Sequence, residues 1–177
     1  MVKGVIAPCK HEEGEVMSLI FTREKKDGLQ RLIVNLQKLN QDVTYHHFKM
    51  DTLATALTLI TKDCFMASLD LKDAYYSVPI FDEHRKWLRF QWKGRLFEYN
   101  ALPNRLASAP RLFTKLMKPV YAPLGAKGHV SSAFLDGSLL VGITRDRCLQ
   151  NVLDTLKHCG HWVSLCIQPS QCSNPLR

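Results

Sequence analysis

The alternation of apolar and polar residues predicts two β-hairpins in the second half of the chain. Residues 87–92 (WLRFQW) and 95–99 (RLFEY) alternate on either side of Lys93-Gly94, which is typical of a two-residue hairpin loop. Residues 131–141 (SSAFLDGSLLV) have two apolar arms around Asp136-Gly137. An Asp-Gly pair supplies the positive backbone dihedral angles that a type I′ turn requires, so this segment also predicts a hairpin.

The first part of the chain predicts a further hairpin and a buried strand. A basic turn at residues 25–28 precedes an extended segment from Arg31 to Leu36. The apolar run 64–70 (CFMASLD) predicts a buried strand that ends at Asp70. Residues 1–20 are predicted to be irregular, because Gly4, Pro8 and Gly14 interrupt any period.

Three amphipathic helices are predicted from apolar residues that recur three and four positions apart. The first follows Asp51 as its N-cap and ends near Lys62, the second begins near Ser108 and Pro110, and the third stops at Gly160. Their apolar faces are Leu53, Leu57 and Ile60, then Leu112, Phe113, Leu116, Met117 and Val120, and last Leu149, Val152, Leu153 and Leu156.

Hairpins interleaved with helices indicate a single α+β domain over residues 1–177, with an antiparallel sheet rather than a doubly wound parallel one. In such a fold Asp70, at a strand end, and Asp136, at a hairpin tip, could meet on neighbouring strands. The residues alone leave two roles open for Asp136, namely a turn residue and a metal ligand.

Composition excludes some classes of protein and favours others. With 46% apolar and 23% charged residues the chain has the composition of a globular protein, and its formal net charge of +8 suits a polyanion such as nucleic acid. Many basic domains nevertheless bind no specific partner. Neither a signal-peptide pattern nor an apolar run of membrane-spanning length is present in the sequence, so we expect an intracellular protein, cytoplasmic or nuclear, with no membrane partner.

The six cysteines include no C-x-x-C pair, which favours reduced, free thiols. Zinc is the less favoured interpretation, because the spacing of the last cysteines and histidines fits no common finger. That group consists of His158, Cys159, His161, Cys166 and Cys172.

Residues 68–80 (SLDLKDAYYSVPI) resemble the first catalytic motif of reverse transcriptases, with a strand ending in Asp70, then Asp73 and Tyr75-Tyr76. Three further segments resemble the family in the same order: KKDGLQRLIVNLQKLN its fingers, ALPNRLASAP the loop beside the incoming nucleotide, and AFLDG the hairpin that normally reads Y-x-D-D. The phrases VTYHHFKM, LRFQWKGRLFEYNALP and SAPRLFTKLMKPV are most similar to retrotransposons of the DIRS type, which encode a tyrosine recombinase elsewhere.

The resemblance implies a right-hand polymerase fold, mainly fingers over about residues 18–67 and mainly palm, with residual fingers segments, over about residues 68–165, with the antiparallel palm sheet packed on helices. Because the chain ends soon after the palm hairpin, we expect it to lack a thumb. It implies addition of deoxynucleotides to a primer on an RNA or DNA template. Two Mg²⁺ ions would be held by Asp70 and Asp136, because magnesium prefers hard oxygen ligands.

The resemblance also implies a set of nucleotide-binding residues. Tyr75 would lie beneath the sugar, and cationic fingers residues would contact the triphosphate. The full set is Lys25, Lys26, Arg31, Asp73, Tyr75 and Asn104. Taken without the family, the lysines are more typical of a solvated turn and the tyrosines of core packing, with one buried and one exposed.

Two substitutions set this chain apart from the family. Gly137 stands where the family has a second aspartate, so one anionic ligand is lost, and Arg105 stands where the family has a glycine close to the nucleotide. We therefore expect a degenerate, truncated reverse transcriptase domain with little polymerase activity. The alternatives are a working polymerase helped by manganese or a neighbouring acidic residue, a non-catalytic nucleic-acid-binding module, and a pseudogene product without function. The sequence gives no indication of the oligomeric state.

Overall fold

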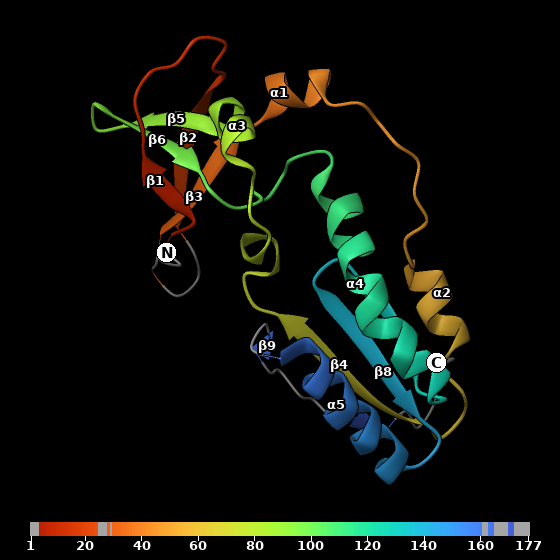
Figure 1. Ribbon diagram of the computed structural model, residues 1–177. Coiled ribbons are helices and arrows are strands. Elements are labelled where there is room, and N and C mark those ends of the chain that lie inside the picture. Colours follow the sequence, from red (N-terminus) through yellow and green to blue (C-terminus); the bar gives the residue numbers. More distant parts are fainter. Residues whose placement is uncertain (1–3, 25–27, 29, 161–162, 165–169, 172–177) are drawn as a thin grey trace. The chain divides into compact units, whose positions relative to one another are not determined.

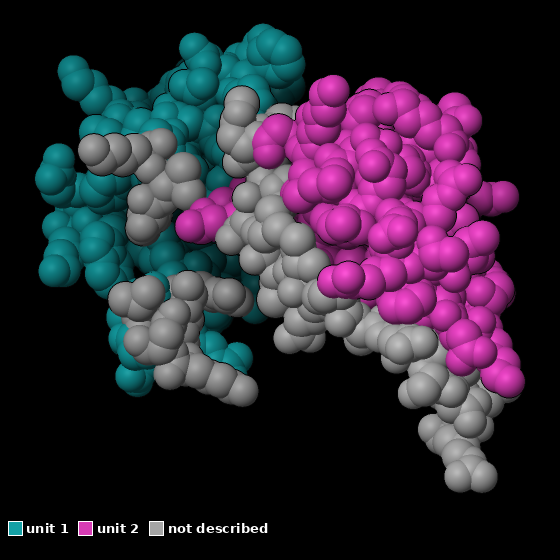
Figure 2. Space-filling model, turned by 90° about the horizontal axis from the view of Figure 1, so that it is seen from below, with its two compact units in different colours: residues 1–46, 75–109 teal, residues 47–74, 110–177 magenta. Residues whose placement is uncertain are grey.

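The computed structural model describes residues 4–24, 28, 30–160, 163–164 and 170–171. They form two compact units, each assembled from separate stretches of the chain (Figure 2). Unit 1 comprises residues 1–46 and 75–109, and unit 2 comprises residues 47–74 and 110–177. Among the described residues, no helix is long and apolar enough to cross a membrane.

Unit 1 is built on a five-stranded sheet with the strand order β1-β6-β5-β2-β3 (Figure 1). Its strands are β1 Ile6–Pro8, β2 Met17–Glu24, β3 Gln30–Asn35, β5 Arg89–Trp92 and β6 Arg95–Tyr99. The predicted β2–β3 and β5–β6 hairpins are confirmed, and only the short β2–β5 pairing is parallel. The prediction that residues 1–20 are irregular was wrong, because β1 pairs with β6 and β2 begins within them. Three residues on a sheet edge are too few to show a period.

The core of unit 1 is formed by residues of this sheet and of neighbouring short helical segments. The segments that contribute are α1 Gln37–Asp42, η1 Ala74–Ser77 and η2 Lys86–Leu88, whereas α3 Asp82–Arg85 has no buried residue. Leu36, Phe90, Tyr99 and Leu102 are among the buried residues at its centre. Leu102 is fully buried, and it begins the loop that leads to Arg105.

A buried arginine ties three acidic side chains together in unit 1. Arg89 is 5% exposed and donates hydrogen bonds to Glu98 (3.0 Å), Glu15 (2.8 Å) and Glu12 (3.0 Å). Burial lowers the pKa of Arg89, but its hydrogen bonds with Glu15 and Glu98 outweigh burial and hold the pKa above its ordinary value. The N-terminal segment is thereby attached to strands β5 and β6.

Acidification is expected to destabilise unit 1 through Glu15. Hydrogen bonds with His11 and then with Arg89 lower the pKa of Glu15 from 4.5 to about 2. Because the folded-state pKa is depressed, the stabilisation is fully present above about pH 4.5 and is lost as the pH falls toward about 2. Urea unfolding across this range should show a shallower loss of stability for Glu15→Gln than for the unaltered chain. The exposed neighbour Glu13, changed to glutamine, is the control, and equal slopes for all three proteins would contradict the prediction.

Unit 2 is built on a sheet with the order β10-β4-β8-β7, and β9 also pairs with β4. Its strands are β4 Phe65–Leu71, β7 Val130–Phe134, β8 Gly137–Gly142, β9 Val163–Ser164 and β10 Ser170–Gln171, and its helices are α2 Leu53–Thr58, α4 Ala109–Ala126 and α5 Arg145–Cys159. Every pairing is antiparallel. Helix α5 packs on β8 and β4 (Figure 1). Tyr121 of α4 forms a hydrogen bond with Ser138 of β8. The predicted α+β class with an antiparallel sheet packed on helices is confirmed.

The first predicted helix differs from its prediction at both ends. Helix α2 is capped by Thr52, whose side chain accepts a hydrogen bond from the backbone N–H of Thr55 at 3.2 Å, and it ends at Thr58 rather than near Lys62. Asp51 instead accepts hydrogen bonds from the Ser132 hydroxyl (2.9 Å) and the Ala133 N–H (3.2 Å). Strand β7 is a sheet edge, and its outward N–H needs an acceptor, which Asp51 supplies.

Replacing Asp51 with alanine is expected to lower the unfolding free energy by about 1–3 kcal/mol, because the Ala133 N–H and the Ser132 hydroxyl lose their acceptor. Asp51→Asn keeps one side-chain oxygen and should cost less. Urea denaturation of the two variants and the unaltered chain measures the difference. An alanine variant as stable as the unaltered chain would show that these contacts carry no stability.

The last predicted helix is present, and Gly160 ends it at φ 59°, but the predicted apolar face is only partly buried. Leu149 and Leu153 are about half exposed, while Asn151 and Thr155 are fully buried. The Asn151 side chain donates hydrogen bonds to the carbonyl groups of Val130 (2.8 Å) and Val141 (3.2 Å). The helix therefore faces the sheet with the Asn151 amide, which is hydrogen-bonded to strand carbonyl groups, while two of the leucines predicted to be buried stay half exposed.

Candidate active site

Two aspartates lie near each other in unit 2, one near the end of a strand and the other in the turn that precedes the neighbouring strand. Asp70 is the last residue but one of β4, and Asp136 lies in the turn between β7 and β8. The Leu71 N–H donates a hydrogen bond to the Asp136 carbonyl at 2.9 Å, so the backbone beside Asp70 is joined to the turn itself. The structure thus brings together the two carboxylates that the sequence proposes as metal ligands.

The electrostatics of the pair suit a bound cation. Partial burial, and then the charge of Asp136, raise the pKa of Asp70 above its ordinary value. The charge of Asp136 opposes ionisation of Asp70, and a divalent cation with hard oxygen preferences would relieve this repulsion. Among the described residues no group of three or more His, Cys, Asp or Glu side chains is arranged to hold a metal. The pair fits one such cation, and a third carboxylate for a two-ion site is not among the described residues.

The turn differs from the predicted type I′ turn at Asp136-Gly137. Phe134 pairs with Gly137, so the two loop residues are Leu135 and Asp136. Leu135 carries the positive φ, 55°, which is the pattern of a type II′ turn by its φ angles, and Gly137 has no positive φ. A leucine held at such a sparsely populated positive φ costs on the order of 1–3 kcal/mol. Because Gly137 pairs with Asp70, the glycine is part of strand β8 and not of the turn. The positive φ that the turn requires is therefore adopted by Leu135.

Gly137 is therefore not required by the conformation of the turn. A Cβ atom built there would have its nearest contact at 3.6 Å, with the Phe134 carbonyl oxygen, which is an ordinary van der Waals distance. Directly paired residues of an antiparallel sheet present their side chains on the same face. A side chain at position 137 would consequently stand beside that of Asp70.

The predicted nucleotide-binding residues are divided between the units. Asp73, exposed and at φ 52°, belongs to unit 2. In unit 1, Tyr75 is half-buried against the core, and the Asn104 side chain donates a hydrogen bond to the Tyr76 hydroxyl at 3.3 Å. Tyr76 is half-buried as well, unlike the exposed partner that core packing alone predicts. Lys25 and Lys26 lie outside the described residues, as does the side chain of Arg31 in β3.

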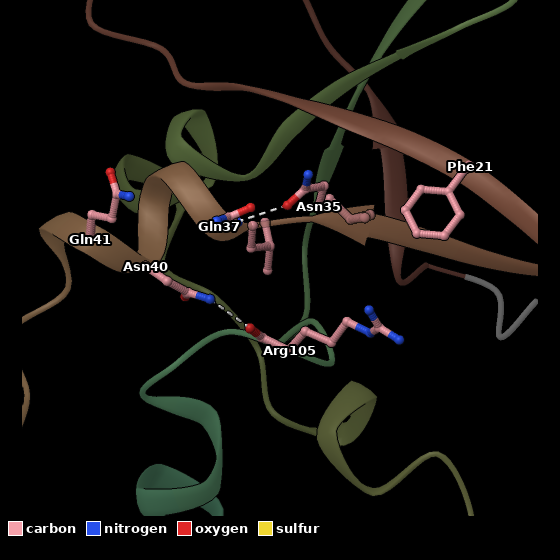
Figure 3. Close-up of a pocket in the computed structure, with 8 residues that line it drawn as sticks. Phe21, Asn35, Gln37, Asn40, Gln41 and Arg105 are labelled. Atoms are coloured by element: carbon pink, nitrogen blue, oxygen red, sulfur yellow. Dashed lines mark hydrogen bonds between the residues drawn. The ribbon is translucent and has the colours of Figure 1, made fainter.

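Unit 1 contains a pocket with both apolar and polar lining residues that the sequence did not predict. Its volume is about 460 Å³. It is lined by Phe21, Val34, Asn35, Leu36, Gln37, Asn40, Gln41 and Arg105 (Figure 3). Four of these are amides, and among the described lining residues Arg105 alone is charged. Figure 3 shows the Arg105 side chain extending away from Asn40, whose amide points at the Arg105 carbonyl.

Asn40 and Arg105, which are joined by a hydrogen bond, form part of the pocket wall. Arg105 has φ 75°, in the region that favours glycine, which agrees with the glycine of the resembling family at this position. Asn40 was missed by sequence reasoning, because five of the six residues of α1 are polar and give no periodic signal that singles it out.

The matches to known proteins extend over most of the chain. The family described as "Reverse transcriptase (RNA-dependent DNA polymerase)" matches residues 20–175. Polyprotein P3 of Commelina yellow mottle virus is 22% identical over 139 residues, which are 78% of this chain and 7% of the viral protein. The enzymatic polyprotein of figwort mosaic virus (strain DxS) is 25% identical over 116 residues, 65% of this chain and 17% of that protein. The Tf2-3 transposon polyprotein of Schizosaccharomyces pombe is 25% identical over 150 residues, 84% of this chain and 11% of that protein.

Solved structures agree on the fold. Prototype foamy virus protease-reverse transcriptase superposes with a TM-score of 0.77 at 18% identity, over 91% of this chain and 21% of the viral chain. The foamy viral enzyme in complex with an RNA/DNA hybrid gives a TM-score of 0.72 at 20% identity, over 92% of this chain and 21% of that one. The chain therefore spans only a small part of the proteins it matches. With a family match over residues 20–175, it belongs to the reverse transcriptase family of retroelements.

Proposed function

We propose that this chain is a retroelement reverse transcriptase domain whose template-directed DNA synthesis is impaired by Gly137 and Arg105. One observation carries the proposal: Asp70 on β4 lies beside the turn that holds Asp136, while a glycine is paired directly with Asp70 where the family has a further aspartate. The carboxylates for nucleotidyl transfer are thus present in part.

The reaction would be attack of a primer 3′-hydroxyl on the α-phosphorus of a deoxynucleotide, with pyrophosphate leaving. Asp70 and Asp136 would hold the divalent cation, which when bound activates the hydroxyl and stabilises the charge on the leaving group. The resemblance to the family implies two Mg²⁺ ions at this position. With one anionic ligand fewer, we expect weaker metal binding and a slower reaction.

The remaining residues would position substrates. Tyr75 would pack beneath the nucleotide sugar, Asp73 and Asn104 would lie at the nucleotide, and Lys25, Lys26 and Arg31 would contact the triphosphate. We assign the pocket of unit 1 to a base of the paired strands, since four amide side chains offer both donors and acceptors. The Arg105 side chain would narrow this space.

A non-catalytic nucleic-acid-binding remnant is the second candidate, favoured by the net charge of +8 together with Gly137. The foamy viral structures in complex with an RNA/DNA hybrid and with double-stranded DNA support template-primer as the partner. Phosphate contacts do not require the metal, so such binding would persist and would weaken with salt.

We further propose that the chain derives from a DIRS-type element and that it acts in the cytoplasm or nucleus.

Primer extension on an RNA template with Mg²⁺, alongside template-primer binding by fluorescence anisotropy at two salt concentrations, tests these candidates. Salt-sensitive binding that Asp70→Asn leaves unchanged, with little extension, is the expected result. Efficient extension that is lost with Asp70→Asn would show that two carboxylates suffice and would overturn the proposed impairment. Absence of both binding and extension would overturn both candidates.

A further inference from the structure

The backbone of the loop over residues 102–108 is strained at Arg105, so contacts from the surrounding structure must stabilise it. Arg105 has φ 75°, which a residue with a side chain rarely adopts. Such a conformation persists only where the surrounding structure fixes it. The loop is held at Leu102 and Leu106, which are buried, while Asn104 and Arg105 between them are exposed. The buried leucines fix the ends of this stretch but not the backbone of Arg105.

One side chain contacts the backbone on both sides of Leu106. The Asn40 side-chain N–H₂ donates a hydrogen bond to the Arg105 carbonyl at 2.9 Å, and the Asn40 side-chain oxygen accepts one from the Ala107 N–H at 2.8 Å. An asparagine amide carries a donor and an acceptor on one rigid group, so it can bridge a carbonyl and an N–H at once. Aspartate retains only the acceptor at neutral pH, and alanine retains neither.

Asn40 is itself held in place. Its N–H donates a hydrogen bond to the Leu36 carbonyl at 2.8 Å, and Leu36 is 2% exposed in the core of unit 1. Leu39, the preceding residue, packs against the same core. The amide therefore projects from a fixed point of α1 toward the loop, and it forms the pocket wall together with Arg105 (Figure 3).

We propose that Asn40 is a positioning residue that fixes the loop beside the nucleotide and so sets the shape of the pocket that receives the base. This inference rests on the proposed function for its consequence, but its structural part concerns only the loop. The acceptor on residue 105 is a backbone carbonyl, so the hydrogen bond does not depend on the arginine side chain and would survive Arg105→Gly.

The structural part is tested by hydrogen exchange of individual amides, read by NMR on the full chain. In Asn40→Ala the Ala107 N–H loses its acceptor, and its exchange should accelerate by about tenfold or more while amides of the β5–β6 hairpin keep their protection. Asn40→Asp should keep Ala107 protected. Gln41→Ala is the matched control, because Gln41 lines the same pocket without contacting the loop backbone among the described hydrogen bonds. Unchanged exchange at Ala107 in Asn40→Ala would overturn the inference.

The functional part is tested in a chain carrying Gly137→Asp and Arg105→Gly. There Asn40→Ala should raise the KM for the deoxynucleotide by about tenfold with a smaller change in kcat, since nucleotide placement is lost rather than the reacting groups. Asp42→Asn, at an exposed position of α1 that does not line the pocket, should leave the KM unchanged. Faster exchange at Ala107 with an unchanged KM would overturn the positioning role. Absence of extension in the doubly substituted chain would count against the proposed function, and the exchange comparison would still decide whether Asn40 holds the loop.

Discussion

Replacing Gly137 with aspartate is expected to raise the rate of primer extension by about two orders of magnitude, which corresponds to roughly 2.7 kcal/mol of transition-state stabilisation. Position 137 is paired with Asp70, and a side chain there meets nothing closer than 3.6 Å. The new carboxylate would therefore join Asp70 and Asp136 as a third hard oxygen ligand without disturbing the turn. Single-turnover extension on an RNA template with Mg²⁺ measures the effect, with and without Arg105→Gly.

Two further variants make this result specific. Gly137→Asn has nearly the same shape as Gly137→Asp but no negative charge, and it should give a much smaller gain. Asp70→Asn in the Gly137→Asp background should abolish the gain, because the metal would lose a ligand on β4. A Gly137→Asp protein that folds as the unaltered chain does, and extends no faster with Arg105→Gly also present, would show that the missing carboxylate is not what limits this domain.

The same substitution should change stability in a metal-dependent manner. Burial, and then the charge of Asp136, already raise the pKa of Asp70, and a third carboxylate without a cation would add to the repulsion. Gly137→Asp should therefore be less stable than the unaltered chain in chelator and should recover with Mg²⁺. This comparison reports metal binding by unfolding alone, independently of polymerase activity.

Replacing Gly142 with alanine is expected to lower the unfolding free energy by about 3 kcal/mol, at the upper end of the cost of overpacking. A Cβ atom at the end of β8 would lie 2.3 Å from the Cys148 nitrogen, 2.6 Å from its Cα and 2.9 Å from the Arg147 carbonyl carbon. All three are backbone atoms of the first turn of α5, so no side-chain rotation can relieve the contact. The helix would have to move away from the sheet.

Gly125→Ala is the matched control for that experiment. Gly125 lies in α4, where an added Cβ meets no heavy atom within 4 Å, and alanine is favoured over glycine in helices. Urea denaturation should therefore show no loss, or a small gain, for this variant beside a large loss for Gly142→Ala. Equal stability of the two variants would mean that α5 can move away from β8 at little cost.

Periodic elements were predictable from the sequence, and contacts between distant residues were not. The alternation around Lys93-Gly94 and the apolar run ending at Asp70 are local patterns, and both gave the correct element. The turn at Asp136 was placed one residue late, because pairing of Gly137 with Asp70 decides which two residues form the loop. Local propensity favours Asp-Gly, and the register overrides it by leaving Leu135 at positive φ.

The hydrogen bonds of Asp51 and Asn40 were also unpredictable, because they too join residues that are distant in the sequence. Asp51 has the local signature of a helix cap, yet its carboxylate is used by the edge strand β7. Asn40 has no signature at all, because its two partners lie far along the chain. For such residues a single sequence records the amide or carboxylate but not its partner.

The pairing of β4 with β8 also orders the events of biosynthesis. Residues 70 and 137 are neighbours in the sheet but leave the ribosome several seconds apart, since chains grow at roughly 5–20 residues per second. Until β8 emerges, β4 has no partner on that side, and the two carboxylates cannot be brought together. The nascent chain therefore passes through an interval in which an apolar strand with a free edge is open to chaperones or to other chains, and Asp70 and Asp136 come together only when that interval closes.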